Sequence, residues 1–193
     1  MSLTEQLTDY VHAAFSGLWV LTQEPDEAER EIAQLARGKG WKLAAWDIAH
    51  GLRSPDAPHA AAAEAGAGDP LAVLRAVPAL AERDGTALVL LHNYHRYLSS
   101  PEVVQTAFAQ LVAGKQQRTF LVVLAPVVAI PVELEKLFVV LEHALPDRDQ
   151  LEWIARELTS DGPEDMPQGE DLQRVLDAGP AGAHACRVVC CWE

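Results

Sequence analysis

Short apolar runs and amphipathic stretches alternate along the chain, and this alternation predicts strands separated by helices. Five runs are apolar enough to form buried strands. They cover residues 17–23, 41–49, 87–93, 119–126 and 139–145. The run at 119–126 is continuously apolar, as expected of a strand that is covered on both faces. The pattern therefore predicts a buried sheet with helical connections.

Between these runs, apolar residues recur at helical spacing behind recognisable start signals. Ser2 and Glu5 have the spacing of a capping box, and so do Ser99 and Glu102. Pro78 interrupts a helical stretch and is expected to kink or divide it. The predicted helices cover residues 2–15, 25–37, 70–83, 101–113, 131–138, 147–159 and 171–178. The helix at 101–113 is expected to bury Val104, Phe108, Leu111 and Val112.

This order of elements indicates an α/β fold with a parallel five-stranded sheet and helices on both faces, because parallel neighbours need crossover connections. The domain is expected to cover residues 1–159. Residues 160–171 contain five acids, two prolines and no basic residue, which is typical of a solvated acidic linker. Residues 172–193 would then form a short helix and a flexible C-terminal tail.

Charge narrows the range of partners. The chain has 193 residues and a formal net charge of -13, from 28 acidic and 15 basic side chains. Nucleic acid and anionic membrane surfaces are therefore not expected as partners, since both attract Lys and Arg. The longest uncharged apolar run, Thr119 to Val132, is too short to span a bilayer. We expect a soluble, cytoplasmic protein.

Candidate chemistry lies where the strands end, because open parallel sheets bind ligands beyond the carboxyl ends of their strands. The residues expected at this edge are Asp47, His92, Asn93, His95, Arg96 and Ala125. A nucleotide-hydrolysing fold would carry a phosphate-binding loop, metal-holding acids and a polar sensor there. The question is whether these residues can replace such groups.

Four requirements of phosphoryl transfer are missing together. The segment "TQEPDEAER" places four carboxylates where a phosphate-binding loop would need GxxxxGK[ST]. His92 and Asn93 replace the acids that would hold Mg²⁺, and Ala125 replaces the polar sensor. Lys136 is the only Lys or Arg in residues 119–147, so no arginine finger is expected in this segment. The sequence predicts a chain that does not hydrolyse ATP and binds it weakly, if at all.

Several short motifs in this order resemble an AAA+ ATPase. They are "YHRY" at 94–97, "AP" at 125–126, "IPVE" at 130–133 and "LPD" at 145–147, the last of which precedes a lid-like helix. Over residues 1–178 the chain is similar to the N-terminal module of a tandem AAA+ family, the hypothetical chloroplast reading frame ATPases and their bacterial relatives. Members of that family often have an acid in place of Asn93.

The resemblance implies a degenerate P-loop NTPase, AAA+-like fold without a cofactor of its own. ATP and Mg²⁺ would bind only in a second, intact AAA+ domain, which this chain lacks. The chain would act without catalysis, by docking or assembling with that active domain or with other subunits, and it can form an oligomer. It would then represent a truncated form of the tandem protein.

Other interpretations of the same residues stay open. His92 and His95 have HxxH spacing and could ligate a metal with a third residue such as His143, but such pairs are commoner as hydrogen-bonding residues. Asp47 and His50 could pair as a base and its orienting group, although no nucleophile accompanies them. A second class of function is small-molecule binding at the carboxyl edge of the sheet. Its polar lining would be Asp47, His92, Asn93 and His95.

The last residues differ in composition from the rest of the chain. All three cysteines, Cys186, Cys190 and Cys191, lie in the final eight residues. We expect residues 179–193 to be a non-native ending, such as a frameshift in a GC-rich gene produces. The alternative is a natural tail in which Cys190 and Cys191 are packed or bind a metal, although adjacent cysteines lack the usual two-residue spacer of a zinc site.

Overall fold

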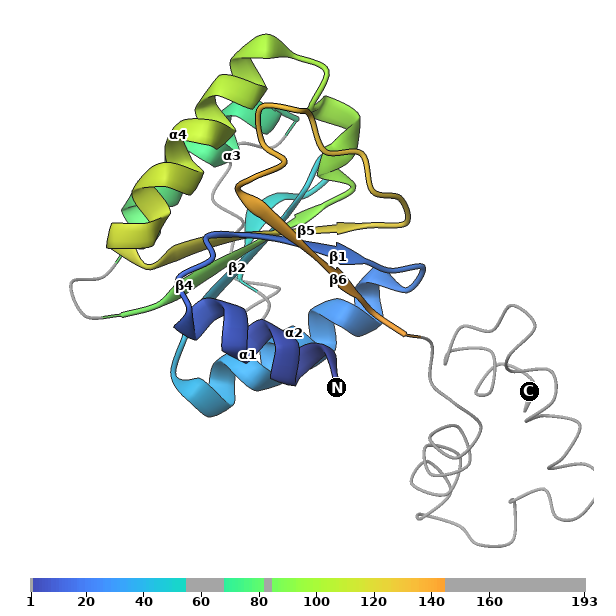
Figure 1. The fold of residues 1–193 in the computed structure, drawn as a ribbon, viewed down its shortest axis with the longest axis vertical. Coiled ribbons are helices and arrows are strands. Elements are labelled where there is room, and N and C mark those ends of the chain that lie inside the picture. Colours follow the sequence, from blue (N-terminus) through green and yellow to red (C-terminus); the bar gives the residue numbers. More distant parts are fainter. Residues whose placement is uncertain (1, 55–67, 82–84, 145–193) are drawn as a thin grey trace, which may run out of the picture. The chain divides into compact units, whose positions relative to one another are not determined.

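The described residues form one sheet of six strands in the order β3-β2-β4-β5-β1-β6 (Figure 1). The computed structural model describes residues 2–54, 68–81 and 85–144. The strands are β1 (Gly17–Leu21), β2 (Lys42–Asp47), β3 (Gly51–Arg53), β4 (Ala87–His92), β5 (Thr119–Ala125) and β6 (Phe138–Glu142). All pairings except one are parallel, which confirms the predicted α/β class. The exception is β3, a short strand that the sequence does not predict and that pairs antiparallel with β2.

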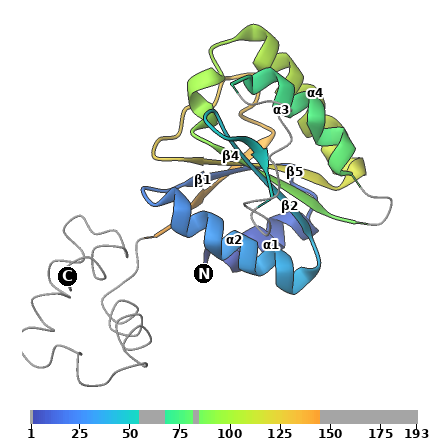
Figure 2. The same cartoon turned by 180° about the vertical axis from the view of Figure 1, so that it is seen from behind.

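Helices cover both faces of the sheet, as predicted (Figure 1 and Figure 2). The α-helices are α1 (Leu3–His12), α2 (Pro25–Lys39), α3 (Pro70–Ala76) and α4 (Pro101–Gln117). Helices α1 and α2 share one apolar core with Leu88 and Leu90 of β4. Helices α3 and α4 share another core with Val89 and Leu91 of the same strand. This alternation is what buries β4 on both faces.

Several start and stop signals act as the sequence indicates. Ser2 and Glu5 form a complete capping box at the N-terminus of α1. Asp69 caps α3, since its carboxylate accepts a hydrogen bond from the Leu71 backbone N–H at 2.8 Å. Pro78 ends that helix, because α3 stops at Ala76 and the chain continues as the short 3-10 helix η1 (Val77–Leu80).

The prediction for α4 is wrong in two details. Its N-cap is Ser100 rather than Ser99, and no side-chain hydrogen bond caps it, so the expected capping box is absent. Phe108 and Val112 do not belong to the buried stripe, since they are 42% and 48% exposed. The residues that α4 buries are Val103, Val104, Ala107, Leu111 and Gly114. Val104 and Leu111 are buried as expected, but Val103, Ala107 and Gly114 complete the stripe instead of Phe108 and Val112, so the helix is rotated relative to the expected stripe.

The predicted helix at 131–138 is also wrong. Residues 132–137 form turns, in which the Leu134 N–H donates to the Pro131 carbonyl and the Leu137 N–H to the Leu134 carbonyl. Leu134 is fully buried, and Phe138 already begins β6. Turns in this short segment place the Leu134 side chain in the core. Too few residues then remain before β6 to form a helix.

Some predictions fall outside the described residues. These are the helix at 147–159, the acidic linker at 160–171, the segment 172–193 and the three cysteines within it. They stay predictions.

Candidate functional site

The carboxyl ends of β2, β4 and β5 place the predicted site residues along one edge of the sheet. Asp47 is the last residue of β2 and His92 the last of β4. Ala125 ends β5 and is buried. Asn93 follows β4 with a φ of 52°, in the left-handed region that Asn tolerates better than most residues. His95 and Arg96 come next, on the 3-10 helix η2 (Tyr94–Tyr97).

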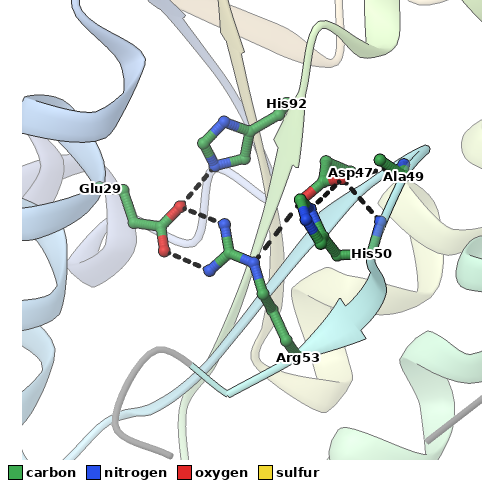
Figure 3. Close-up of polar contacts among 6 residues, drawn as sticks. All are labelled: Glu29, Asp47, Ala49, His50, Arg53 and His92. Atoms are coloured by element: carbon green, nitrogen blue, oxygen red, sulfur yellow. Dashed lines mark hydrogen bonds and ion pairs between the residues drawn. The ribbon is translucent and has the colours of Figure 1, made fainter. Parts of the chain in front are cut away.

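Two of these predicted residues, Asp47 and His92, join a chain of ionisable groups that links four elements, α2, β2, β3 and β4 (Figure 3). His92 Nε2 lies 2.6 Å from Glu29 Oε2 on α2. Arg53 on β3 donates two hydrogen bonds to the same carboxylate, from Nη1 to Oε1 at 2.5 Å and from Nη2 to Oε2 at 2.9 Å. Arg53 Nε lies 3.6 Å from Asp47 Oδ2. We call Glu29, Asp47, Arg53 and His92 the edge network.

Asp47 also organises the turn between β2 and β3. Its Oδ1 accepts hydrogen bonds from the backbone N–H groups of Ala49 at 2.9 Å and His50 at 2.8 Å. The His50 ring lies against the same carboxylate, with Nδ1 at 2.9 Å from Oδ1. Asp47 and His50 are therefore in contact, while their role as a base and its orienting group stays a prediction. The pair belongs to the turn that leads into β3, where Arg53 contacts Glu29.

The electrostatics of the edge network favour the charged forms of Glu29, Asp47 and Arg53. Burial would raise the pKa of Glu29, but hydrogen bonds from His92 and Arg53 outweigh burial and lower this pKa to about 2. Burial likewise opposes ionisation of Asp47, yet hydrogen bonds from His50 and Ala49 leave its pKa below the usual value. The hydrogen bonds from Arg53 to Glu29 raise the pKa of the guanidinium.

This arrangement is suited to holding elements together and poorly suited to proton transfer. A general base works best when its pKa lies near the operating pH, and the pKa of Glu29 lies far below it. The Glu29 oxygens already accept three hydrogen bonds from His92 and Arg53. The edge network therefore satisfies its own polar groups and fixes α2, β3 and β4 to one another.

The segment between β1 and α2 lies where a phosphate-binding loop would lie, and two of its backbone N–H groups are already hydrogen-bonded. The Thr22 N–H donates to the Ala125 carbonyl at 2.9 Å. The Glu24 N–H donates to Thr22 Oγ1 at 3.0 Å, and that hydroxyl also lies 2.8 Å from His143 Nδ1. The side chain of Glu24 is buried at the N-terminus of α2. Phosphate sites at helix N-termini use open N–H groups and a positive field. Here the Thr22 and Glu24 N–H groups are already hydrogen-bonded, and the buried carboxyl group of Glu24 lies at the start of α2.

Residues 3–143 match the family described as SpoVK-like AAA ATPase, N-terminal domain. This chain belongs to that family. No curated protein matches it significantly. No helix in the described part of the chain is long and apolar enough to cross a membrane.

Solved structures of AAA proteins share the fold of this N-terminal domain. The AAA domain of FIGL-1 in complex with ADP is 15% identical with a TM-score of 0.57, and the match covers 90% of this chain and 57% of that one. The complex of HORMA, CdnC and Trip13 from E. coli MS115-1 includes a chain that is 8% identical with a TM-score of 0.54, covering 90% of this chain and 71% of that one. The chain thus spans little more than half the length of the FIGL-1 chain it matches. At these identities the likeness concerns the fold alone.

The three histidines considered for a metal site are not held by a common partner in this N-terminal AAA domain. His92 pairs with Glu29, whereas His143 contacts Thr22 and lies 3.5 Å from a Glu31 carboxylate oxygen. Among residues 2–54, 68–81 and 85–144, no three His, Cys, Asp or Glu side chains gather as metal ligands would. His95 Nδ1 is buried and has no hydrogen-bond partner in this part of the chain. Burial and the nearby charge of Arg96 lower the pKa of His95.

Glu29 and Arg53 are the site residues that the sequence does not single out. In the sequence, Glu29 is only one of four acids after the first strand, and Arg53 belongs to a strand that the sequence does not predict. The only usable signal is weak and concerns Arg53: Asp47 and Gly51 flank a tight turn, which places this arginine near the end of β2.

Proposed function

We propose that this N-terminal AAA domain is a degenerate, non-catalytic module that docks with an active AAA+ domain. It acts by position within the assembly, while ATP and Mg²⁺ are bound by the active domain. The observation that carries the proposal is the loop after β1. Its Thr22 and Glu24 N–H groups are committed to acceptors within the protein, and Glu24 places a buried carboxyl group beside them.

The strand ends support the same proposal. Hydrolysis of ATP requires groups that hold Mg²⁺, orient water and stabilise the charge on the γ-phosphate. The end of β4 offers His92, which pairs with Glu29, and the end of β5 offers the buried methyl group of Ala125. Asn93 occupies a left-handed turn position, for which backbone geometry is a sufficient reason. Groups of the required chemistry are not found at these positions.

A docking role is consistent with the family. The family is described as the N-terminal domain of an ATPase, so an ATP-hydrolysing part would lie in another domain or chain. A module without turnover can still contribute through its contacts, by orienting or activating the domain beside it. The proposed partner is therefore an active AAA+ domain or a neighbouring subunit.

Sedimentation velocity of a two-component mixture tests this proposal. The partner to use is the AAA+ domain with an intact GxxxxGK[ST] loop that is encoded nearest to this chain. We expect a complex to form, and we expect ATP turnover by the mixture to vanish when the lysine of the partner's loop is replaced by alanine. Failure to form a complex, or turnover that survives this replacement, would contradict the proposal.

Small-molecule binding at the carboxyl edge is the second candidate function. One observation favours it: His95 Nδ1 is buried without a hydrogen-bond partner among the described residues, beside the exposed Asn93 and Arg96. The candidate lining is Asp47, His92, Asn93 and His95. A rise in melting temperature with a metabolite, absent in His95→Phe, would favour this function over docking.

A further inference from the structure

The connection between β5 and β6 covers only part of one sheet face: its Leu134 is buried against the core that contains Trp19 and Phe138, whereas Val140 in the middle of the edge strand β6 is exposed. These strands are both parallel neighbours of β1, and such crossovers usually carry a helix that packs on the sheet. Residues 126–137, all of them described, contain turns and no helix (Figure 1). The layer formed by α3 and α4 therefore has no third helix above β6 in the described part of the chain.

Apolar side chains border this uncovered area. Val140 belongs to the same face of β6 as Phe138, whose ring packs edge-on against buried Trp19 with centroids 5.6 Å apart. Unlike Phe138, Val140 is 46% exposed. Val127, Val128 and Val132 of the 126–137 connection are exposed as well. The Trp19 indole N–H donates to the Val127 carbonyl, so the 126–137 connection lies beside Trp19 on this face.

Helix α4 supplies one side of the area. Its Leu111 approaches Gly17 of β1 from the same side as Phe138, because a Cβ added at Gly17 would lie 2.9 Å from Leu111 Cδ2 and 3.0 Å from Phe138 Cδ1. Phe108 and Val112 lie beside that buried contact, one helical turn apart, and both are exposed. We call Phe108, Val112, Val127, Val128, Val132 and Val140 the valine surface.

The charges beside the valine surface are mainly acidic. Glu133 and Glu135 are exposed in the turns next to Val132, with Lys136 between β6 and these acids. Glu142 follows Val140 on the same face of β6 and is exposed. The whole chain carries a formal net charge of -13, which repels a second copy and attracts a basic partner.

We propose that the valine surface binds an amphipathic helix of the active AAA+ partner, with basic residues on either side of the apolar face of that helix. This inference rests on the proposed docking function and names its contact surface. A helix suits this surface because the crossover covers Trp19 and Phe138 with turns and leaves Val140, farther out on the edge strand, exposed beside the apolar side chains of the connection and of α4. Its apolar face would cover Val140 and the Phe108–Val112 side of α4, while its Lys and Arg side chains would meet the acids at the border.

Fluorescence anisotropy with a labelled synthetic peptide tests this proposal. The probe is a helical peptide of leucine and lysine, about 14 residues long, with leucines at i, i+3, i+4 and i+7. The comparison peptide has glutamate in place of lysine. We expect the basic peptide to bind the full chain at least about tenfold more tightly than the acidic one.

Matched variants locate the binding. Val140→Asp and the double variant F108S/V112S should each weaken binding of the basic peptide at least about tenfold. Phe15→Ser and Ile48→Ser are the controls, since Phe15 and Ile48 are equally exposed, at 42% and 41%, but lie outside the valine surface. The milder Val140→Thr serves if the aspartate variant fails to reach the wild-type circular dichroism spectrum.

The contrary outcomes are distinct. Equal loss in Phe15→Ser, no loss in the surface variants, or no binding by the wild-type chain would overturn the valine surface as a helix site. Dimerisation of the wild-type chain that Val140→Asp abolishes would identify a second copy as the occupant instead. Complex formation with the active AAA+ domain that survives Val140→Asp would refute this surface and leave the docking function standing.

Discussion

Glu29 on α2 and His92 at the end of β4 are joined by a contact of 2.6 Å between Oε2 and Nε2, although 63 residues separate them in sequence. Arg53 completes the contact from β3, so a helix, a central strand and a hairpin converge on one carboxylate. Where β2 and β4 end, the carboxyl edge of this AAA domain is thus occupied by side chains of the domain itself.

Replacing Glu29 with glutamine should lower the free energy of unfolding by about 2–3 kcal/mol at neutral pH. The reason is that Arg53 and His92 lose their carboxylate in a poorly exposed setting, where breaking an ion pair is costly. Urea denaturation measures the change. The control is Glu27→Gln on the same helix, whose partner Arg30 is 70% exposed, and which should cost no more than about 0.5 kcal/mol. Equal effects of the two substitutions would show that the edge network adds nothing specific.

The stability of the wild-type domain should fall in acid because of Glu29. Its pKa is about 2 in the folded chain and 4.5 without the fold, so the contribution is fully present above pH 4.5 and is lost as the pH falls toward about 2. Linkage sets an upper limit of about 3 kcal/mol on this loss, because solvent near the carboxylate screens part of the interaction. Urea titrations between pH 5 and about 2 should show a steeper decline for the wild type than for Glu29→Gln. Parallel curves would contradict the assignment of this pKa.

Gly114→Ala should destabilise the domain by about 2 kcal/mol, although alanine favours helices. A Cβ at this position of α4 would overlap the carbonyl oxygen of Thr119 at the start of β5, and relieving such overpacking costs about 1–3 kcal/mol. Gly38→Ala in α2 is the matched control, because nothing lies within 4 Å of its added Cβ. It should stabilise the domain by about 0.5–1 kcal/mol through helix propensity. Thermal melts distinguish the two signs.

Asn93→Val should cost about 1–2 kcal/mol, whereas Asn93→Gly should change stability by less than about 0.5 kcal/mol. The left-handed φ of 52° penalises a β-branched side chain and suits glycine. Chemical denaturation of both variants measures the difference. If Asn93→Gly proved as damaging as Asn93→Val, the side chain of Asn93 would have a role beyond the turn.

Local patterns in the sequence predict the architecture well, because strong periodicity and capping chemistry act over short distances. The apolar runs at 17–23, 87–93 and 119–126 become parallel strands that end one or two residues earlier, and Ser2 and Pro78 start and interrupt helices as expected. The position of His92 at the end of a central strand follows from the same reasoning. These features depend on neighbours within one or two helical turns.

The remaining features depend on partners that the sequence does not reveal. Arg53 meets Glu29 only because a three-residue antiparallel strand turns back on β2, and a segment that short has no usable period. Phe108 and Val112 look buried by spacing, yet α4 packs closely through Ala107 and Gly114 and leaves them exposed. Small residues carry little weight in a hydrophobic pattern, so the rotation of α4 had no clear signal.

Isothermal titration calorimetry of the chain with Mg·ATP tests the central claim most directly. The claim is that the carboxyl edge, with its committed Thr22 and Glu24 N–H groups, holds no working nucleotide site. We expect no measurable heat of binding, or a dissociation constant no tighter than about 1 mM, which corresponds to about -4 kcal/mol. A dissociation constant in the low micromolar range or tighter would contradict it.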